Sequence, residues 1–144
     1  MSHAGYAQVT AIEHFDGAWC RAQINRVWSN LTHKRKTLLP FAPIHSQLSF
    51  PSGINQGVQE IPVRNIVGSV DRAFEFDRDF RPLHKNLRQR WANVWALHAQ
   101  RGWEPIVVHQ IGDLYFVEDG HHRVSVARDL GLESIEAVVI SYPT

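Results

Sequence analysis

A glycine, two histidines and an arginine stand together where a predicted strand meets a predicted helix, in the stretch FVEDGHHRVSVARDLG of residues 116–131. Gly120 permits a tight turn and places no side chain between the backbone and a ligand. The first N–H groups of the following helix have no partner inside it, and with the helix dipole they favour an anion such as phosphate. Arg123 carries a planar, permanently charged group that matches two phosphate oxygens, and His121 and His122 offer further donors. This spacing therefore predicts a phosphate site.

The same residues also fit a purely structural corner. Asp119 is a suitable N-cap residue, and Arg123 could pair with Glu118 or Asp119 instead of an anion. Adjacent histidines rarely both reach one ion, and no Cys or His at ligand spacing accompanies them, so the pattern predicts no structural zinc site. Asp119 and the four residues that follow it are thus candidate phosphate-binding residues with a structural alternative.

A second stretch of chemical interest is SVDRAFEFDRDFRP, residues 69–82, which mixes acidic, basic and aromatic side chains. If this strip is extended, alternation places its carboxylates on one side and its phenylalanines on the other, against the core. Grouped carboxylates could hold Mg²⁺ through water or act as a general base, and the arginines could contact phosphate. A solvated loop with surface ion pairs is the alternative. The expected carboxylate side holds Glu75, Asp77 and Asp79, the expected core side holds Phe74, Phe76 and Phe80, and Asp71 and Arg72 precede both.

Periodicity predicts the elements that hold the strip. β-branched residues predict a strand around residues 60–67, with Pro62 at its beginning or on an exposed edge. A long helix follows, with Pro82 in its first turn and Gly102 at its end. The stripe that predicts it consists of Leu83, Leu87, Trp91, Val94, Trp95 and His98.

Turn residues predict the elements around the corner. The stretch PIVVHQIGDLYFVED, residues 105–119, predicts a β-hairpin that turns at Gly112 and Asp113. The helix after the corner is expected to end at Gly131, and a last buried strand, SIEAVVI, follows at residues 134–140.

The N-terminal segment, residues 1–57, predicts one or two helices with Gly17 as a weak point, followed by a basic cluster HKRK at residues 33–36 and a proline-rich loop. We therefore expect two parts, a helical extension at 1–57 and a main domain at 58–144. The stripe of the expected helix comprises Ile12, Phe15, Trp19, Ile24, Val27, Trp28 and Leu31.

Composition narrows the class of protein. With 15 Lys and Arg against 14 Asp and Glu, the net charge is +1, so no overall basic field of a nucleic-acid binder exists. The single Cys20 excludes an internal disulfide. Neither a signal-type apolar region nor a long apolar run is present, so we expect a cytoplasmic protein without membrane association.

The order of these elements resembles the ParB/sulfiredoxin fold, in which a strand, a helix, a hairpin and a DGHxR-type corner build a nucleotide-phosphate pocket. The resemblance covers about residues 60–140, including EIPVRNIVGSV, PIVVHQIGDLYFVEDGHHR and GLESIEAVV. It implies an α+β protein with a small mixed sheet and packed helices, to which residues 1–57 add a helical extension.

The resemblance also carries site residues. Gly120 to Arg123 occupy the places of the GERR box of ParB proteins and the GCHR motif of sulfiredoxins. The sulfiredoxin nucleophile is the cysteine after the glycine; here His121 stands there, so sulfinic-acid repair is not expected. The corner DGHHR is similar to the DGHTR of free-serine kinases of this fold, which use glutamates near the site. That similarity makes Asp71, Glu75 and Asp77 candidates for base or metal roles. His121, which could stabilise phosphate oxygens, is a further candidate catalytic residue, and Arg72 of the strip is a candidate phosphate contact.

Two functions of different classes follow from the resemblance. The first is a phosphotransferase or nucleotide hydrolase that uses ATP, ADP or CTP, with or without Mg²⁺. The second is a module whose nucleotide switches its association with DNA or a protein partner, with residues 33–36, Lys85, Arg88 and Arg90 on the phosphate backbone. A full partition protein is not expected, because no helix-turn-helix or dimerisation region follows, although a homodimer fits either function. A nuclease ranks below both.

Overall fold

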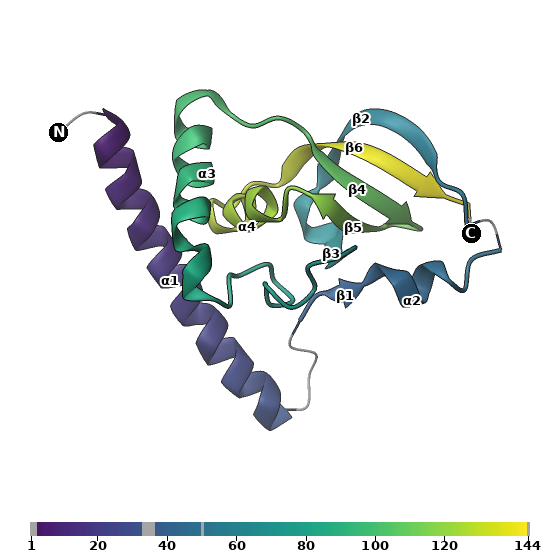
Figure 1. The fold of residues 1–144 in the computed structure, drawn as a ribbon, viewed down its shortest axis with the longest axis horizontal. Coiled ribbons are helices and arrows are strands. Elements are labelled where there is room, and N and C mark those ends of the chain that lie inside the picture. The colour runs from purple at the N-terminus through teal and green to yellow at the C-terminus, as the bar shows by residue number, and fades with distance from the viewer. Residues whose placement is uncertain (1–2, 33–36, 50, 144) are drawn as a thin grey trace.

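The computed structural model describes residues 3–32, 37–49 and 51–143 and contains a six-stranded mixed sheet (Figure 1). The strands are β1 Leu39–Pro40, β2 Ile54–Pro62, β3 Ile66–Ser69, β4 Ile106–Ile111, β5 Leu114–Asp119 and β6 Ser134–Tyr142. Their order across the sheet is β1-β3-β5-β4-β6-β2. The pairs β1–β3, β3–β5 and β4–β6 are parallel, whereas β4–β5 and β2–β6 are antiparallel. The helices are α1 His3–Thr32, α2 Phe41–His45, α3 Arg88–Arg101 and α4 His121–Asp129, with α1, α3 and α4 to one side of the sheet (Figure 1).

The long helix α1 packs along α3, which in turn packs on α4 beside the sheet (Figure 1). The expectation of one or two helices resolves to one, since Gly17 lies inside α1 without interrupting it. Its buried face is smaller than the expected apolar stripe: Ile24 and Val27 are 69% and 60% exposed. Phe15 of that stripe is buried as expected, at 1% exposed. The rest of the contact face consists of Ala11, Ala18 and Ala22, each at most 3% exposed, because small side chains let two helices approach closely. Within the described part of the chain, no helix carries an apolar stretch long enough to cross a bilayer.

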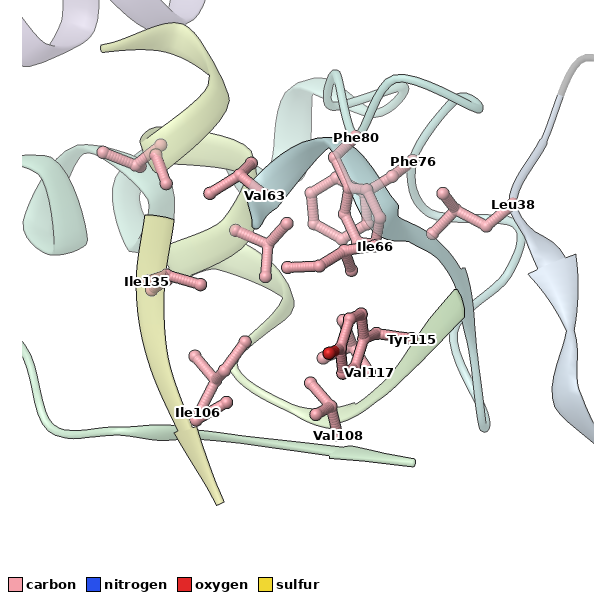
Figure 2. Packing of buried hydrophobic residues seen from close by; sticks show 14 of the residues in the cluster. Leu38, Val63, Ile66, Phe76, Phe80, Ile106, Val108, Tyr115, Val117 and Ile135 are labelled. Atoms are coloured by element: carbon pink, nitrogen blue, oxygen red, sulfur yellow. The ribbon is translucent and has the colours of Figure 1, made fainter. Parts of the chain in front are cut away.

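The core forms between the sheet and the segments that cross it (Figure 2). Phe76 and Phe80 of the strip lie beside Ile66 of β3, and all three side chains are fully buried. Deletion of such a buried phenylalanine typically costs about 3–5 kcal/mol, so the strip is anchored by its aromatic residues. This anchoring sets where the charged residues between them are placed.

The single strand expected at residues 60–67 is two strands. β2 ends at Pro62, a 3₁₀ turn follows at Val63–Asn65, and β3 starts at Ile66. β2 pairs with β6 at one edge of the sheet while β3 pairs with β1 and β5 near the other, so the chain crosses the sheet at this turn. Pro62 closes an edge strand, as expected of a residue without an N–H.

The long helix begins later than expected, because the chain around Pro82 pairs with the strip instead. Phe76 and Pro82 form an isolated bridge, and Leu83 donates its N–H to the carbonyl of Glu75 at 3.0 Å. A 3₁₀ turn at Lys85–Leu87 then leads into α3. The other turn predictions are confirmed. Gly102 follows the end of α3 with a φ of +79°, Gly112 lies in the turn between β4 and β5 with a φ of +61°, and Gly131 follows α4 with a φ of +71°. Glycine adopts such positive φ angles at little cost.

The segment expected as a loop before residue 58 contains regular structure. β1 adds to the edge of the sheet, α2 follows it, and β2 starts at Ile54. The basic cluster at residues 33–36 lies outside the described residues. The division into parts at 1–57 and 58–144 stays a prediction.

Candidate functional site

The corner between β5 and α4 has the backbone geometry of an open helix N-terminus. Gly120 has φ +107° and ψ +25°, no side chain among the described residues caps the helix, and the first intrahelical bond runs from Val124 N–H to the Gly120 carbonyl. A Cβ at position 120 would lie 2.4 Å from Ile106 Cγ2. Glycine is therefore required by its φ and by packing on β4, whereas the sequence had suggested free access for a ligand. The first-turn N–H groups of α4 are left for an external acceptor.

A cavity of about 380 Å³ lies over this corner. It brings the corner together with the start of the strip and with α3, three regions far apart in the sequence. Such a volume falls in the range of small-molecule sites. The cavity, called the corner cavity below, is lined by Asp71, Arg72, Arg90, Val94, Glu118, Asp119, Gly120, His121, His122 and Arg123.

His121 is fixed by a hydrogen bond to the end of β3. Its Nε2 lies 2.6 Å from Ser69 Oγ, which also accepts the N–H of Arg72 at 2.8 Å. The Ser69 hydroxyl accepts a hydrogen bond from Arg72 and can at the same time donate its own proton to a neutral imidazole. Burial lowers the pKa of His121 to about 4, against the opposing charge of Asp71. The ring is therefore neutral near pH 7, and it stacks on Phe76 at 6.2 Å between centroids.

His122 is buried beside the cavity with both ring nitrogens free. The residue is 6% exposed, and neither Nδ1 nor Nε2 has a hydrogen-bond partner among the described residues. Burial lowers the pKa of His122 to about 4, with Arg90 and Arg72 acting in the same direction. An unsatisfied buried polar group costs about 1–3 kcal/mol, so a ligand that bonds to this ring gains that amount back. Both nitrogens are closed to solvent in this structure, so the ring could bond to a bound molecule only if it turned toward the corner cavity.

Arg123 already has protein partners. One terminal nitrogen donates to the carbonyls of Glu104 and Pro105 at 2.8 and 3.0 Å, and the other lies 3.3 Å from Asp119 Oδ2. The pairing with Asp119 is the one weighed as a structural alternative. The guanidinium contributes its positive charge to the corner cavity while it ties the chain before β4 to the first turn of α4.

Two other arginines are more open to a ligand. Arg72 faces Glu75 at 3.7 Å, with both side chains well exposed, so this pair contributes little to stability. Arg90 projects from the first turn of α3 into the corner cavity, is exposed, and has no ion pair among the described residues. From the sequence, Arg90 was expected only to contact a nucleic-acid backbone. No local signal indicates that this face of α3 lies over the corner, since that placement comes from packing.

The structure separates the four strip candidates. Asp71 and Arg72 line the corner cavity, whereas Glu75 and Asp77 do not. Asp77 is 1% exposed and accepts the N–H groups of Asp79 and Arg81 at 2.9 and 2.8 Å. Burial raises the pKa of Asp77, against those hydrogen bonds. Asp77 holds the turn of its own strip.

The expected alternation along the strip is wrong. Phe74 is 78% exposed, and Asp77 lies on the buried side with Phe76 and Phe80. The strip turns back on itself at residues 76–82, and Phe80 has a φ of +60°, which breaks the period of two. Among the described residues, no three His, Cys, Asp or Glu side chains converge on a point where they could hold a metal ion.

No family model matches the chain, and no curated protein matches it in sequence. Among solved structures it is similar to a sulfiredoxin from Arabidopsis thaliana, at 21% identity and a TM-score of 0.45, over 59% of this chain and 85% of that chain. It is also similar to a C-terminally truncated chromosome-partitioning protein ParB from Caulobacter crescentus complexed with CTP-γ-S, at 20% identity and a TM-score of 0.42. That match covers 60% of this chain and 46% of the ParB chain, under half of its length. The structure itself is of the α+β class that the sequence predicted, with a small mixed sheet and packed helices.

Proposed function

We propose that the protein binds a nucleotide through its phosphate groups in the corner cavity. The observation that carries the proposal is an uncapped N-terminus of α4 inside a cavity that three arginines, Arg72, Arg90 and Arg123, also line. Free N–H groups, a helix dipole and clustered guanidinium groups all favour phosphate oxygens. The neutral rings of His121 and His122 add hydrogen bonds without adding charge.

The catalytic form of the proposal is phosphoryl transfer from the nucleotide or its hydrolysis. Asp71 is the strip carboxylate that reaches the corner cavity, and it lies close enough to His121 to influence its pKa. It is placed to accept the proton of an attacking hydroxyl or water. Mg²⁺ would enter with the nucleotide, held by phosphate oxygens and by one or two carboxylates such as Asp71 and Glu118, as is usual for this ion. Asp71→Asn should then stop phosphate release while leaving nucleotide binding in place.

Calorimetric titration with ATP, ADP, CTP and GTP, each with and without Mg²⁺, tests the binding step. CTP is included because the ParB structure holds a CTP analogue. Arg90→Ala removes an exposed arginine of the corner cavity, and Arg26→Ala removes an exposed arginine of α1 that lines none of the cavities described here. We avoid Arg123→Ala, because that side chain also holds the backbone at residues 104 and 105.

The expected result is that a nucleotide binds the native protein and Arg26→Ala equally and binds Arg90→Ala about tenfold more weakly, the loss of one charge-assisted hydrogen bond. The proposal fails if no nucleotide binds the native protein. It fails equally if both arginine variants weaken binding to the same extent, since that result reports only net charge.

A further inference from the structure

A second cavity, of about 590 Å³, adjoins the corner cavity, and Val94 and Arg123 line both. Its character differs from that of its neighbour. The corner cavity is lined by charged residues, whereas the second cavity has Val94, Leu97 and Trp103 on its wall and Glu104 at an exposed position. An apolar recess that opens beside a cationic one matches a ligand with a flat apolar part and an anionic part.

The aromatic wall of the second cavity is held in place. Gly102 ends α3 with a φ of +79°, which turns the chain so that Trp103 lies back against the helix. The indole Nε1 donates to the Val94 carbonyl at 2.9 Å, and the ring contacts His98 at 4.3 Å between centroids. Leu97, on the next turn of α3, is 37% exposed despite its apolar side chain. The recess is therefore preorganised, which lowers the entropic cost of binding.

Arg123 fixes the two cavities relative to each other. Its guanidinium donates to the carbonyls of Glu104 and Pro105, directly after Trp103, while its backbone belongs to the first turn of α4. The loop that carries the indole is thus tied to the helix N-terminus. A ligand that spans both cavities meets its apolar wall and its anion site at a set separation.

We propose that the second cavity, called the nucleoside cleft below, receives the base and ribose of the nucleotide whose phosphates lie in the corner cavity. This inference rests on the proposed function and adds the position of the nucleoside. The base lies against Trp103 and Leu97, and the exposed carboxylate of Glu104 accepts hydrogen bonds from ribose hydroxyls. Every base has a π-face, so the cleft binds purine and pyrimidine nucleotides alike.

Titration with two kinds of ligand separates the nucleoside from the phosphates. ATP and CTP probe both cavities, whereas inorganic tripolyphosphate probes the corner cavity alone. Trp103→Leu keeps an apolar side chain but removes the ring, and Trp103→Phe retains a ring. We expect Trp103→Leu to bind ATP and CTP about tenfold or more weakly, as for loss of a base–aromatic stack, and to bind tripolyphosphate as the native protein does. Trp103→Phe should recover most of the nucleotide affinity.

A second pair of variants guards against misfolding of the Trp103 variants. Leu97→Gln introduces a polar group into the nucleoside cleft at a partly exposed helix position, and Leu114→Gln makes the same change at the β4–β5 hairpin, where the leucine is 42% exposed. Only Leu97→Gln should weaken nucleotide binding, again without effect on tripolyphosphate.

The outcomes distinguish the two proposals. If tripolyphosphate binds but nucleotides bind no more tightly, or if Trp103→Leu and Leu97→Gln leave nucleotide affinity unchanged, the nucleoside cleft is wrong and the phosphate site stands. A Trp103→Leu protein that loses both ligands equally also overturns the cleft, because the ring would then act on the corner. If neither ligand binds the native protein, the proposed function itself fails.

Discussion

The corner at residues 119–123 and the strip at residues 69–82 are both rich in charged side chains, yet they place those charges differently. At the corner, the backbone leaves its N–H groups open, and the side chains around them line a cavity. In the strip, the central carboxylate, Asp77, accepts hydrogen bonds from the N–H groups of its own turn. The two regions therefore differ in their backbone N–H groups. These groups already have acceptors within the strip, whereas at the corner they remain open to a ligand.

The two regions also depend on each other. Phe76 from the strip stacks on His121 and meets His122 edge to face at 5.5 Å between centroids. Ser69, the first residue of the strip, bonds to His121. The corner histidines therefore pack against the strip. Of the charged residues of the strip, Asp71 and Arg72 line the corner cavity.

The largest expected difference between the regions is a sensitivity to acid that comes from the corner. The folded pKa of both His121 and His122 is depressed from 6.5 to about 4 by burial. The unfolded chain therefore takes up protons first, and stability present above about pH 6.5 is lost as the pH falls toward 4. Each histidine should make the free energy of unfolding about 2 kcal/mol smaller at about pH 5 than at about pH 7.5.

Urea unfolding at the two pH values measures this loss. His122→Gln cannot titrate, so it should show about 2 kcal/mol less pH dependence than the native protein. The matched control is His84→Gln, at an exposed position just beyond the strip, which should keep the full dependence. Equal pH dependence in all three proteins would contradict the burial of a neutral His122.

A somewhat smaller effect should identify Asp77 as a residue of the fold. Asp77→Ala leaves the N–H groups of Asp79 and Arg81 without an acceptor and should lower stability by about 1–3 kcal/mol. Burial raises the pKa of this carboxyl. Asp77→Asn keeps an acceptor oxygen for the same N–H groups, so it should cost much less than Asp77→Ala.

Denaturant unfolding at neutral pH compares these variants with Asp79→Ala, whose side chain is 42% exposed. Nucleotide affinity measured on folded Asp77→Asn should equal that of the native protein. A specific loss of nucleotide binding in Asp77→Asn, with stability unchanged, would return Asp77 to the catalytic role that its sequence context suggested.

Local signals were sufficient for part of this structure. Gly112, Gly102 and the corner glycine mark a hairpin turn, a helix end and a strand-to-helix junction because glycine adopts positive φ at low cost. The crossing from β2 to β3 at residues 63–65 could not be predicted, since it depends on pairing with β6 and β5, far along the chain. The positive φ of Phe80 has no sequence signal either, and it decides which strip side chains face the core.

The candidate site also contains some residues that local sequence signals could indicate and others that only the folded structure reveals. The corner residues are adjacent in sequence, so a motif could indicate them together. Arg90 and Trp103 belong to the proposed site only through packing of α3 and its following loop against α4, which no spacing encodes. Glu75 and Asp77 were instead expected at the site and are not part of it. Their residue types suited the chemistry, but the turn of the strip places them outside the lining of the corner cavity.

The central claim is that the open N–H groups of the corner bind phosphate, and NMR spectroscopy of the backbone amides tests it most directly. Tripolyphosphate is added to ¹⁵N-labelled protein, followed by ATP. We expect saturable shifts of the amides of His121, His122 and Arg123 with the first ligand, and further shifts near Trp103 with the second. Amide shifts confined to the strip at residues 73–81, or no saturable shift at the corner, would contradict the account.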